Sequence, residues 1–191
     1  MRVLVVDESA ERGEALRAAL RHAGCEVTPS LSLPFALLQA IEGLQPDVIV
    51  IETQSPSRNL LEHLAQVTQH APRPIVMFAA DDSPGAIRVA TRAGVSAYVV
   101  DGLERKSIKA IVDAAVARFE EFQALRARLA EANLKLSERR LVEKAKGLLM
   151  KRRGIDEDAA YAALRKMAMD RSLKLAEVAK RVIEAADFLG A

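Results

Sequence analysis

The sequence predicts an α/β plus all-α protein, in which a doubly wound domain with a parallel sheet precedes one long helix and a three-helix bundle. Short β-branched runs alternate five times with helical segments over about 120 residues, which is typical of that α/β class. From Glu104 to Arg153 the helical pattern continues without a proline. Apolar residues then recur at helical spacing in two further segments.

Local spacing defines each element of the α/β domain. The strands are Val- and Ile-rich runs of the kind buried in parallel sheets, and the helices carry apolar residues on one side. In the first helix we expect Arg12, Arg17 and Arg21 to point outward. The predicted strands are Arg2–Asp7, Cys25–Thr28, Asp47–Ile51, Pro74–Ala79 and Ala97–Val100. The predicted helices are Ala10–Ala23, Phe35–Leu44, Leu60–Gln69, Gly85–Ala93 and one beginning at Lys106, with Pro29–Pro34 as a loop.

Acidic residues follow the predicted strands, where doubly wound proteins bind their ligands. Asp7 and Glu8 follow the first strand, Glu52 the third and Asp101 the fifth, while Ala79 ends the fourth. We expect these carboxylates to be solvated at a loop rim. The alternative is a divalent cation such as Mg²⁺ held by Asp7, Glu8 and Glu52, although no cofactor is expected to be required.

Residues 1–120 resemble a response-regulator receiver domain, which has a flavodoxin-like (CheY-like) fold. The resemblance is carried by the Asp-Glu pair after the first strand, by PDVIVIE ahead of a loop and by GVSAYVV before the last helix. Glu52 stands where a receiver has its phospho-accepting aspartate, Ala79 replaces the hydroxyl that senses phosphate, and Asp101 replaces the paired lysine. Receiver chemistry needs a carboxylate at a set distance from Mg²⁺ and a cation for the phosphoryl oxygens. The departures therefore predict a pseudo-receiver that phosphotransfer does not switch.

The long helix contains a short coiled-coil seam. Because of this seam, residues 121–137 are predicted to be a helical linker between domains at 1–120 and 138–191. Two heptads are marginal alone, so we expect the seam to pair two subunits, with docking onto its own chain as the alternative. Its apolar residues follow 3-4-3-4 spacing over Phe122, Leu125, Leu129, Ala132 and Leu136.

The bundle begins within the end of the long helix, where Leu141, Ala145, Leu148 and Leu149 form one apolar stripe. Gly154 is placed to end that helix, because glycine adopts a left-handed conformation without strain. Asp156 is predicted to N-cap the second helix and Ser172 the third.

Cations concentrate in this bundle and make it the candidate site for a polyanion. Residues 1–103 carry a net charge of −4, residues 104–137 carry +2 and residues 138–191 carry +4. A basic helix can equally be a solvated surface, so charge alone does not decide between the two interpretations. The candidate phosphate contacts are Lys144, Lys146, Lys151, Arg152 and Arg153 on the first helix, with Arg165 and Lys166 on the second.

Four residues in the bundle have two interpretations each. Gly147 costs about 1 kcal/mol relative to Ala inside a helix, which points to close approach by RNA or by another helix. Arg165 can contact a base edge or phosphate through both nitrogens, or form an ion pair with Asp158 or Glu157. Ala145 is predicted to belong to the core, with contact to RNA as the alternative. Tyr161 is a candidate stacking platform, but we expect it to pack against the bundle.

The segment EKAKGLLMKRRGIDEDAAYAALRKMAMDR resembles the ANTAR domain, the RNA-binding module of transcription antitermination regulators. The match covers residues 138–190. The domain order, a pseudo-receiver followed by a long helix and this domain, resembles that of the nitrate- and nitrite-assimilation antiterminators. This resemblance implies binding to leader mRNA with two hexaloop hairpins, which prevents formation of a terminator. It also implies control by a separate nitrate- or nitrite-sensing protein similar to a solute-binding protein.

Other classes of protein are less well supported by the sequence. A DNA-binding response-regulator-type activator would need a recognition helix with several polar base-reading residues, which is not evident. A protein-interaction adaptor would bind no nucleic acid. No nucleophile–base pair or glycine-rich phosphate loop indicates an enzyme, and the single Cys25 excludes a disulfide within the chain. No apolar run approaches about 18 residues, so we expect no membrane association and a cytoplasmic location.

Overall fold

The computed structural model describes residues 1–8, 10–28, 37–100 and 107–188. The chain divides into two compact units, Met1–Gln123 and Ala124–Ala191. Helix α5 (Ile108–Arg153) contributes residues to both units.

The first unit contains a five-stranded parallel sheet in the order β2-β1-β3-β4-β5. The central strands β1 and β3 are Val- and Ile-rich and buried on both faces, as parallel strands require. Val3 pairs with Val48 and Asp7 with Glu52, so two acidic residues lie side by side at the carboxyl end of the sheet. The strands are β1 (Arg2–Asp7), β2 (Glu26–Val27), β3 (Val48–Thr53), β4 (Ile75–Ala79) and β5 (Ala97–Val100).

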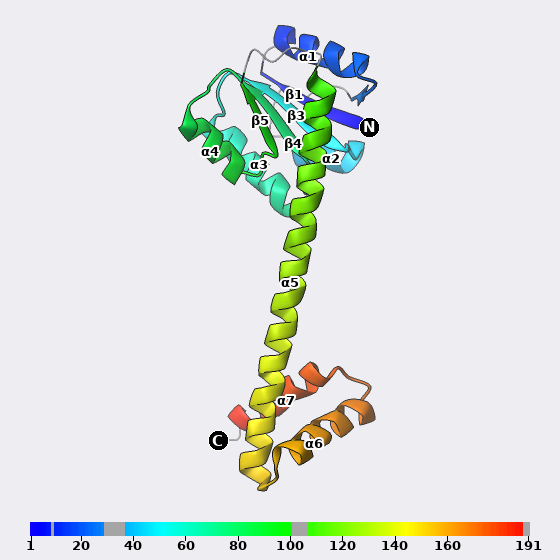
Figure 1. Cartoon of the computed structure of the whole chain (residues 1–191), viewed down its shortest axis with the longest axis vertical. Coiled ribbons are helices and arrows are strands. Elements are labelled where there is room, and N and C mark those ends of the chain that lie inside the picture. Colours follow the sequence, from blue (N-terminus) through cyan, green and yellow to red (C-terminus); the bar gives the residue numbers. More distant parts are fainter. Residues whose placement is uncertain (9, 29–36, 101–106, 189–191) are drawn as a thin grey trace. The chain divides into compact units, whose positions relative to one another are not determined.

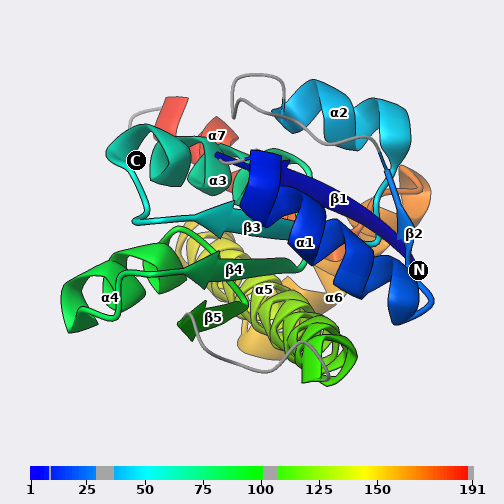
Figure 2. The same cartoon turned by 90° about the horizontal axis from the view of Figure 1, so that it is seen from above.

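Helices cover both faces of this sheet (Figures 1 and 2). On one face, Leu20 and Val112 belong to a core shared by α1 and the first turns of α5. On the other face, Ile41 and Leu64 belong to a second core shared by α2, α3 and α4. This arrangement confirms the predicted doubly wound domain. The covering helices are α1 (Ala10–His22), α2 (Leu37–Leu44), α3 (Arg58–His70) and α4 (Pro84–Arg92).

Two helices begin earlier than the apolar pattern predicts, because serine caps set their first turns. The Leu60 N–H donates to Ser57 Oγ at 3.2 Å, so α3 begins at Arg58. The Ala86 N–H donates to Ser83 Oγ at 3.3 Å, so α4 begins at Pro84. The predicted loop at 29–34 and the predicted helix starts at Phe35 and Lys106 lie outside the described residues.

The second unit is a bundle formed by the end of α5 with α6 (Glu157–Asp170) and α7 (Leu175–Phe188). Each helix is amphipathic and buries one stripe, which is the ordinary arrangement of a small bundle. The three helices form one apolar core from Ala145, Leu149, Ala160, Leu164, Ala168, Val178, Ala179 and Ile183.

Ser172 does not cap α7, and that prediction is wrong. Ser172 has a φ of 51° and its N–H donates to Met169 O at 3.2 Å, so it ends α6 in a left-handed conformation. An N-cap needs extended backbone, which Ser172 does not have. The Val178 N–H donates to Lys174 O at 3.2 Å, and α7 begins at Leu175.

The predicted coiled-coil seam lies exposed on α5. The exposed fractions of Phe122 and Leu125 are 55%, that of Leu129 is 62% and that of Leu136 is 48%. Pairing through this surface stays a prediction.

Candidate nucleic-acid interface

A tight corner joins α5 to α6. Gly154 has a φ of +64° and its N–H donates to Met150 O at 3.0 Å, which ends α5. Asp156 then N-caps α6, because its Oδ1 accepts from the Ala159 N–H at 2.8 Å. Both predictions at this corner are confirmed, and the corner fixes which side chains of α5 and α6 are left outside the core.

Lys146 is buried at this corner, with only 7% of its surface exposed. Its Nζ lies 2.6 Å from Glu157 Oε1 and 2.9 Å from Glu143 Oε2. The hydrogen bond to Glu157, and then that to Glu143, raises the pKa of Lys146, and the same bond lowers the pKa of Glu157. A lysine held by two carboxylates is poorly placed for a phosphate, so we exclude Lys146 from the candidate surface.

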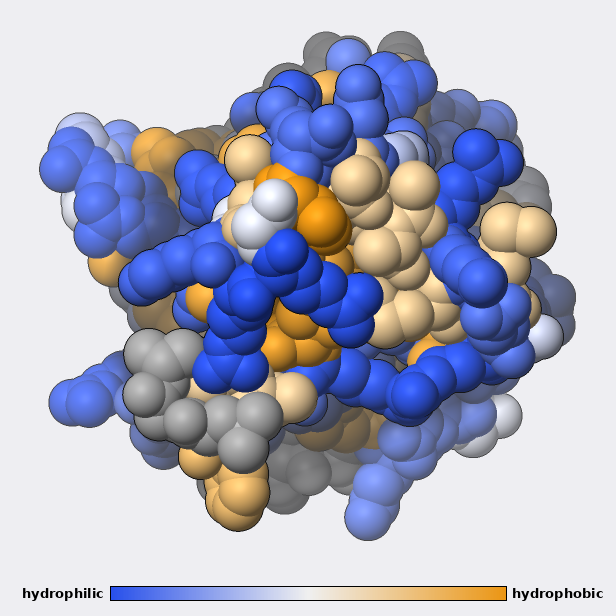
Figure 3. All heavy atoms as spheres, turned by 90° about the horizontal axis from the view of Figure 1, so that it is seen from below, coloured by the Kyte–Doolittle hydropathy of each residue, from blue (hydrophilic) through white to orange (hydrophobic). Residues whose placement is uncertain are grey.

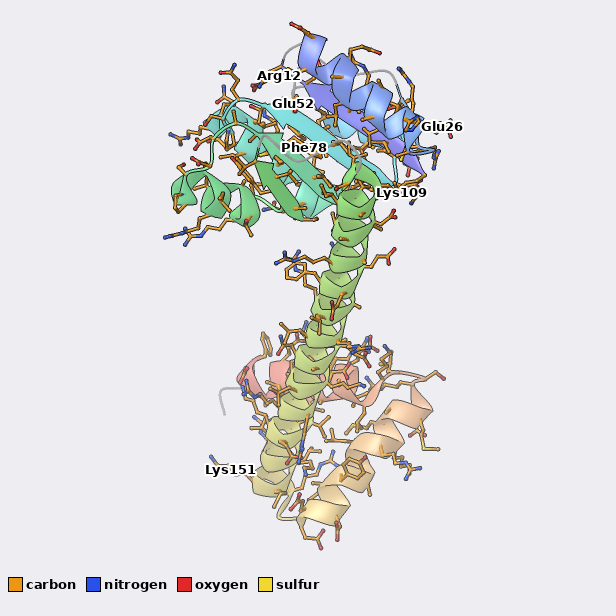
Figure 4. All side chains as sticks on the ribbon, turned by 45° about the horizontal axis from the view of Figure 1, so that its top comes forward. Arg12, Glu26, Glu52, Phe78, Lys109 and Lys151 are labelled. Carbon is orange, nitrogen blue, oxygen red and sulfur yellow. The ribbon has the colours of Figure 1, made fainter. Side chains whose placement is uncertain are left out.

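Arg152 also has a bond within the bundle. Its Nη2 donates to Ala186 O at 3.3 Å, near the carboxyl-terminal end of α7, where a cation is favourable. Figure 4 shows Lys151, one residue earlier, on the side of α5 away from α6. The predicted contact residues that are exposed and form neither an ion pair nor a hydrogen bond with another described residue are Lys144, Lys151, Arg153, Arg165 and Lys166.

Tyr161 is 45% exposed, so the expectation that it packs against the bundle is wrong. The core positions of α6 are taken by Ala160 and Leu164, which turns Tyr161 outward. Arg165 lies one helical turn further along the same face. Glu157, one of the two proposed partners of Arg165, instead binds Lys146. The outer face of α6 therefore presents an aromatic ring beside a guanidinium group.

The two small residues of α5 have different surroundings. Ala145 is fully buried in the bundle core, as predicted. Gly147 is exposed, and a Cβ built on it would have no described atom within 4 Å beyond its own helix backbone and chain neighbours. Packing against another helix of the described chain therefore does not explain this glycine.

Figure 3 shows the face of the molecule seen from below, where apolar surface in orange and tan is bordered by hydrophilic side chains in blue. Splayed nucleobases present flat apolar faces flanked by charged phosphates. A surface that mixes apolar and hydrophilic side chains in this way can contact both parts of a single-stranded loop where its hydrophilic side chains are cations.

Two carboxylates at the acidic edge of the sheet, Asp7 and Glu52, are buried, which corrects the expectation that they are solvated, while Glu8 is exposed as expected. Asp7 and Glu52 are each only 6% exposed. Arg17 Nη1 donates to Asp7 Oδ2, and Arg12 Nε lies 3.5 Å from Glu52 Oε1 (Figure 4). Arginines of α1 therefore neutralise both carboxylates, so the prediction that Arg12 and Arg17 point outward is wrong.

One spacing in the sequence indicates the missed contact. A Cβ at Gly13 would collide with the Asp7 carboxylate, so this part of α1 lies directly against the end of β1. Arg17 is one helical turn after Gly13 and therefore reaches the same carboxylate. The sequence contains a signal for this ion pair: after the acidic end of the strand, a glycine is followed four residues later by an arginine.

The remaining acidic positions do not complete a cation site. Thr53 Oγ1 donates to Glu8 Oε2 at 2.6 Å, and Ala79 is fully buried. Over the described part of the chain, no three His, Cys, Asp or Glu side chains are grouped so as to hold a metal ion. The alternative of a cation at Asp7, Glu8 and Glu52 is thus not supported, and Asp101 lies outside the described residues.

Comparison with known families agrees with this geometry. Residues 3–113 match the response regulator receiver domain, and residues 130–183 match the ANTAR domain. The chain is a response regulator with a carboxyl-terminal ANTAR domain. Both domains are regulatory and non-enzymatic, and the exposed cations of α5 and α6 belong to the ANTAR domain.

Known relatives support the same assignment. The chain is 29% identical over 183 residues to the transcriptional regulatory protein PdtaR of Mycobacterium tuberculosis, covering 96% of this chain and 89% of that one. A segment of 63 residues is 44% identical to the nitrate regulatory protein of Klebsiella oxytoca, covering 33% of this chain and 16% of that one. The signal receiver domain of NarL from Mycobacterium tuberculosis matches with a TM-score of 0.52 and 25% identity, over 60% of this chain and 94% of that one.

No helix within the described ranges is both long and apolar enough to cross a membrane.

The domain boundaries predicted at residues 120 and 137 stay predictions.

Proposed function

We propose that this chain is an RNA-binding transcription antiterminator that binds paired hairpins in nascent leader RNA and prevents a terminator from forming. Family membership supports a regulator of the ANTAR type. The observation that carries RNA binding is the outer face of α6, where exposed Tyr161 lies one turn from exposed Arg165. An aromatic ring stacks on a splayed base, while a guanidinium binds a base edge or phosphate through two nitrogens.

We propose that the receiver regulates the ANTAR domain without accepting a phosphoryl group. Glu52 is engaged by Arg12, Asp7 by Arg17, and Ala79 offers no hydroxyl. A separate sensor protein would then supply the signal. Similarity to the nitrate regulatory protein supports nitrate or nitrite as that signal, detected by a solute-binding-like partner.

We also propose that α5 pairs two subunits through its seam, Phe122, Leu125, Leu129, Ala132 and Leu136. Glu121 and Arg126 flank the seam at positions that oppose each other in a parallel pair, where their charges attract. Burial of the exposed leucines supplies the main stabilisation.

The direct test is selection of RNA by the full-length chain. A library of two tandem RNA hairpins with randomised hexanucleotide loops is incubated with immobilised protein, and the bound molecules are sequenced. We expect enrichment of particular loops, with binding that weakens as salt rises. Arg165→Ala should weaken binding to the enriched RNA by about tenfold, which corresponds to loss of about 1.4 kcal/mol.

Arg181→Ala is the matched control, because Arg181 is an exposed arginine on α7 outside the proposed surface. The circular dichroism spectra of both variants should equal that of the wild type. Absence of any enriched loop, or tighter binding to duplex promoter DNA than to RNA, would favour a DNA-binding activator. Binding to neither nucleic acid would favour an adaptor.

A further inference from the structure

A second basic surface of the ANTAR domain lies on α5. Arg140, Lys144, Gly147 and Lys151 stand at positions i, i+4, i+7 and i+11, so they share one face of the helix. All four residues are exposed. We call this set the glycine stripe. At a rise of about 1.5 Å per residue it extends over about 16 Å.

The cations of the glycine stripe are unpaired among the residues that the structure describes. Other exposed lysines nearby bind carboxylates on their own helix: Lys135 Nζ lies 2.7 Å from Glu131 Oε1, and Lys180 Nζ lies 3.8 Å from Glu184 Oε1. Between residues 139 and 153 the only carboxylate is Glu143, and it is bound by Lys146 at 2.9 Å. The stripe therefore presents positive charge without a free anion of its own.

Gly147 is unfavourable for the isolated helix, since an exposed glycine inside a helix is less stable than alanine. Nothing in the described chain uses the space where a Cβ would stand. Gly13, by contrast, is explained by contact with Asp7. The absence of a side chain at Gly147 therefore leaves the helix backbone open to an external molecule, between cations at Lys144 and Lys151.

We propose that the ribose-phosphate backbone of a bound RNA loop passes directly over Gly147, with its phosphates on Arg140, Lys144 and Lys151. This inference rests on the proposed function and adds where on α5 the RNA lies. A Cβ at residue 147 would hold the strand away from the helix and weaken all three phosphate contacts together.

Charge favours RNA over a second copy of the chain as the occupant. A symmetric pair uses the same patch of both subunits, so a dimer on this face would bring two sets of cations together. Like charges placed in that way repel, whereas phosphates attract them. The apolar seam ends at Leu136, before the stripe begins.

The test compares two glycine-to-alanine variants of the full-length chain. Gly147→Ala changes the stripe, and Gly43→Ala is its control, because Gly43 also lies in a helix with nothing within 4 Å of a built Cβ but belongs to the receiver. The probe is the most enriched two-hairpin RNA from the wild-type selection. We expect Gly147→Ala to weaken RNA binding about tenfold or more, while Gly43→Ala leaves it unchanged.

Stability separates this effect from misfolding. Alanine is the better helix former, so Gly147→Ala should raise the thermal midpoint of the ANTAR domain by about 4 °C while it weakens binding. Gly147→Ala with wild-type affinity overturns the inference but leaves the proposed function intact. Unchanged affinity together with a changed oligomeric mass would instead assign the stripe to a second copy. A wild-type chain that enriches no RNA overturns both proposals.

Discussion

Lys146 Nζ lies 2.6 Å from Glu157 Oε1, and this ion pair ties α5 to the first turn of α6. Because both helices carry the proposed RNA contacts, the pair holds those contacts in register. Glu157 also lies where the helix dipole favours negative charge, so one carboxylate serves both helices.

This ion pair predicts how the stability of the ANTAR domain depends on pH. The Lys146 hydrogen bond lowers the pKa of Glu157 below 4.5, so the pair contributes fully above that pH and is lost as pH falls through the lower folded-state pKa. The pKa of Lys146 is raised above 10.5, so the contribution is lost again only in strong alkali. Glu157→Gln should therefore lower the free energy of unfolding of the domain at pH 7. The difference in that free energy between Glu157→Gln and the wild type should become smaller in acid.

Tyr161 provides the measurement. The chain has two tyrosines and no tryptophan, so in a Tyr98→Phe background fluorescence reports the ANTAR domain alone. Urea unfolding is followed at pH 7 and at about pH 3, below the ordinary carboxyl range. If the difference in unfolding free energy between Glu157→Gln and the wild type is the same at both pH values, the ion pair does not stabilise the domain as described. Asp187→Asn is the control, since Asp187 is an exposed carboxylate on α7.

The buried Asp7–Arg17 pair predicts a large effect on receiver stability. Arg17→Met leaves the Asp7 carboxylate buried without this guanidinium, which should cost about 3 kcal/mol of unfolding free energy. Asp7→Asn combined with Arg17→Met should cost less than the two single changes added together. Tyr98 fluorescence during urea unfolding, in a Tyr161→Phe background, measures the receiver. If the stability losses of the two single variants add up to that of the double variant, Asp7 and Arg17 do not interact directly.

The receiver should not be phosphorylated at Glu52. Incubation with a small acyl phosphate donor and Mg²⁺ should leave the mass of the intact chain unchanged, because Arg12 engages Glu52 and no hydroxyl stands at Ala79. The control is the same treatment of Glu52→Gln. An added phosphoryl group that disappears in the Glu52→Gln variant would refute the pseudo-receiver.

The seam on α5 should determine the oligomeric state. Leu129→Glu places a charge in both copies of the seam and should weaken pairing at least about 100-fold, since each buried leucine contributes about 1.5–3 kcal/mol. Leu134→Glu is the control, because Leu134 is 58% exposed but lies off the 3-4-3-4 spacing. Sedimentation equilibrium reports the mass. Equal masses for both variants would argue against this seam.

Lys151 should contribute to RNA binding through charge alone. Lys151→Ala should weaken binding to all loop sequences similarly and reduce the slope of log affinity against log salt by about one. Filter binding at several salt concentrations measures the slope, with Lys180→Ala as control because Lys180 is paired with Glu184. An unchanged slope for Lys151→Ala would remove this residue from the stripe.

The parts of the candidate surface that depend on interactions between residues close in sequence could be predicted from the sequence. Gly154 and Asp156 could be placed as the corner because a glycine stop and an aspartate cap act within one turn. Tyr161 was placed wrongly and the burial of Lys146 was not foreseen, since an amphipathic spacing gives the face of a residue only to within one position. Whether Ala160 or Tyr161 faces the core depends on how α6 packs against α5 and α7.

The sequence alone determined the alternation of strands and helices, the helical period of the bundle's apolar stripes and the membership of both families, because these depend on period and motif. Tertiary structure decided which charges are free. Asp7 meets Arg17 only when β1 packs on α1, and Lys146 meets Glu157 only when α5 turns back into α6. Charge pairing over such separations is a property of three-dimensional proximity, and linear spacing does not contain it.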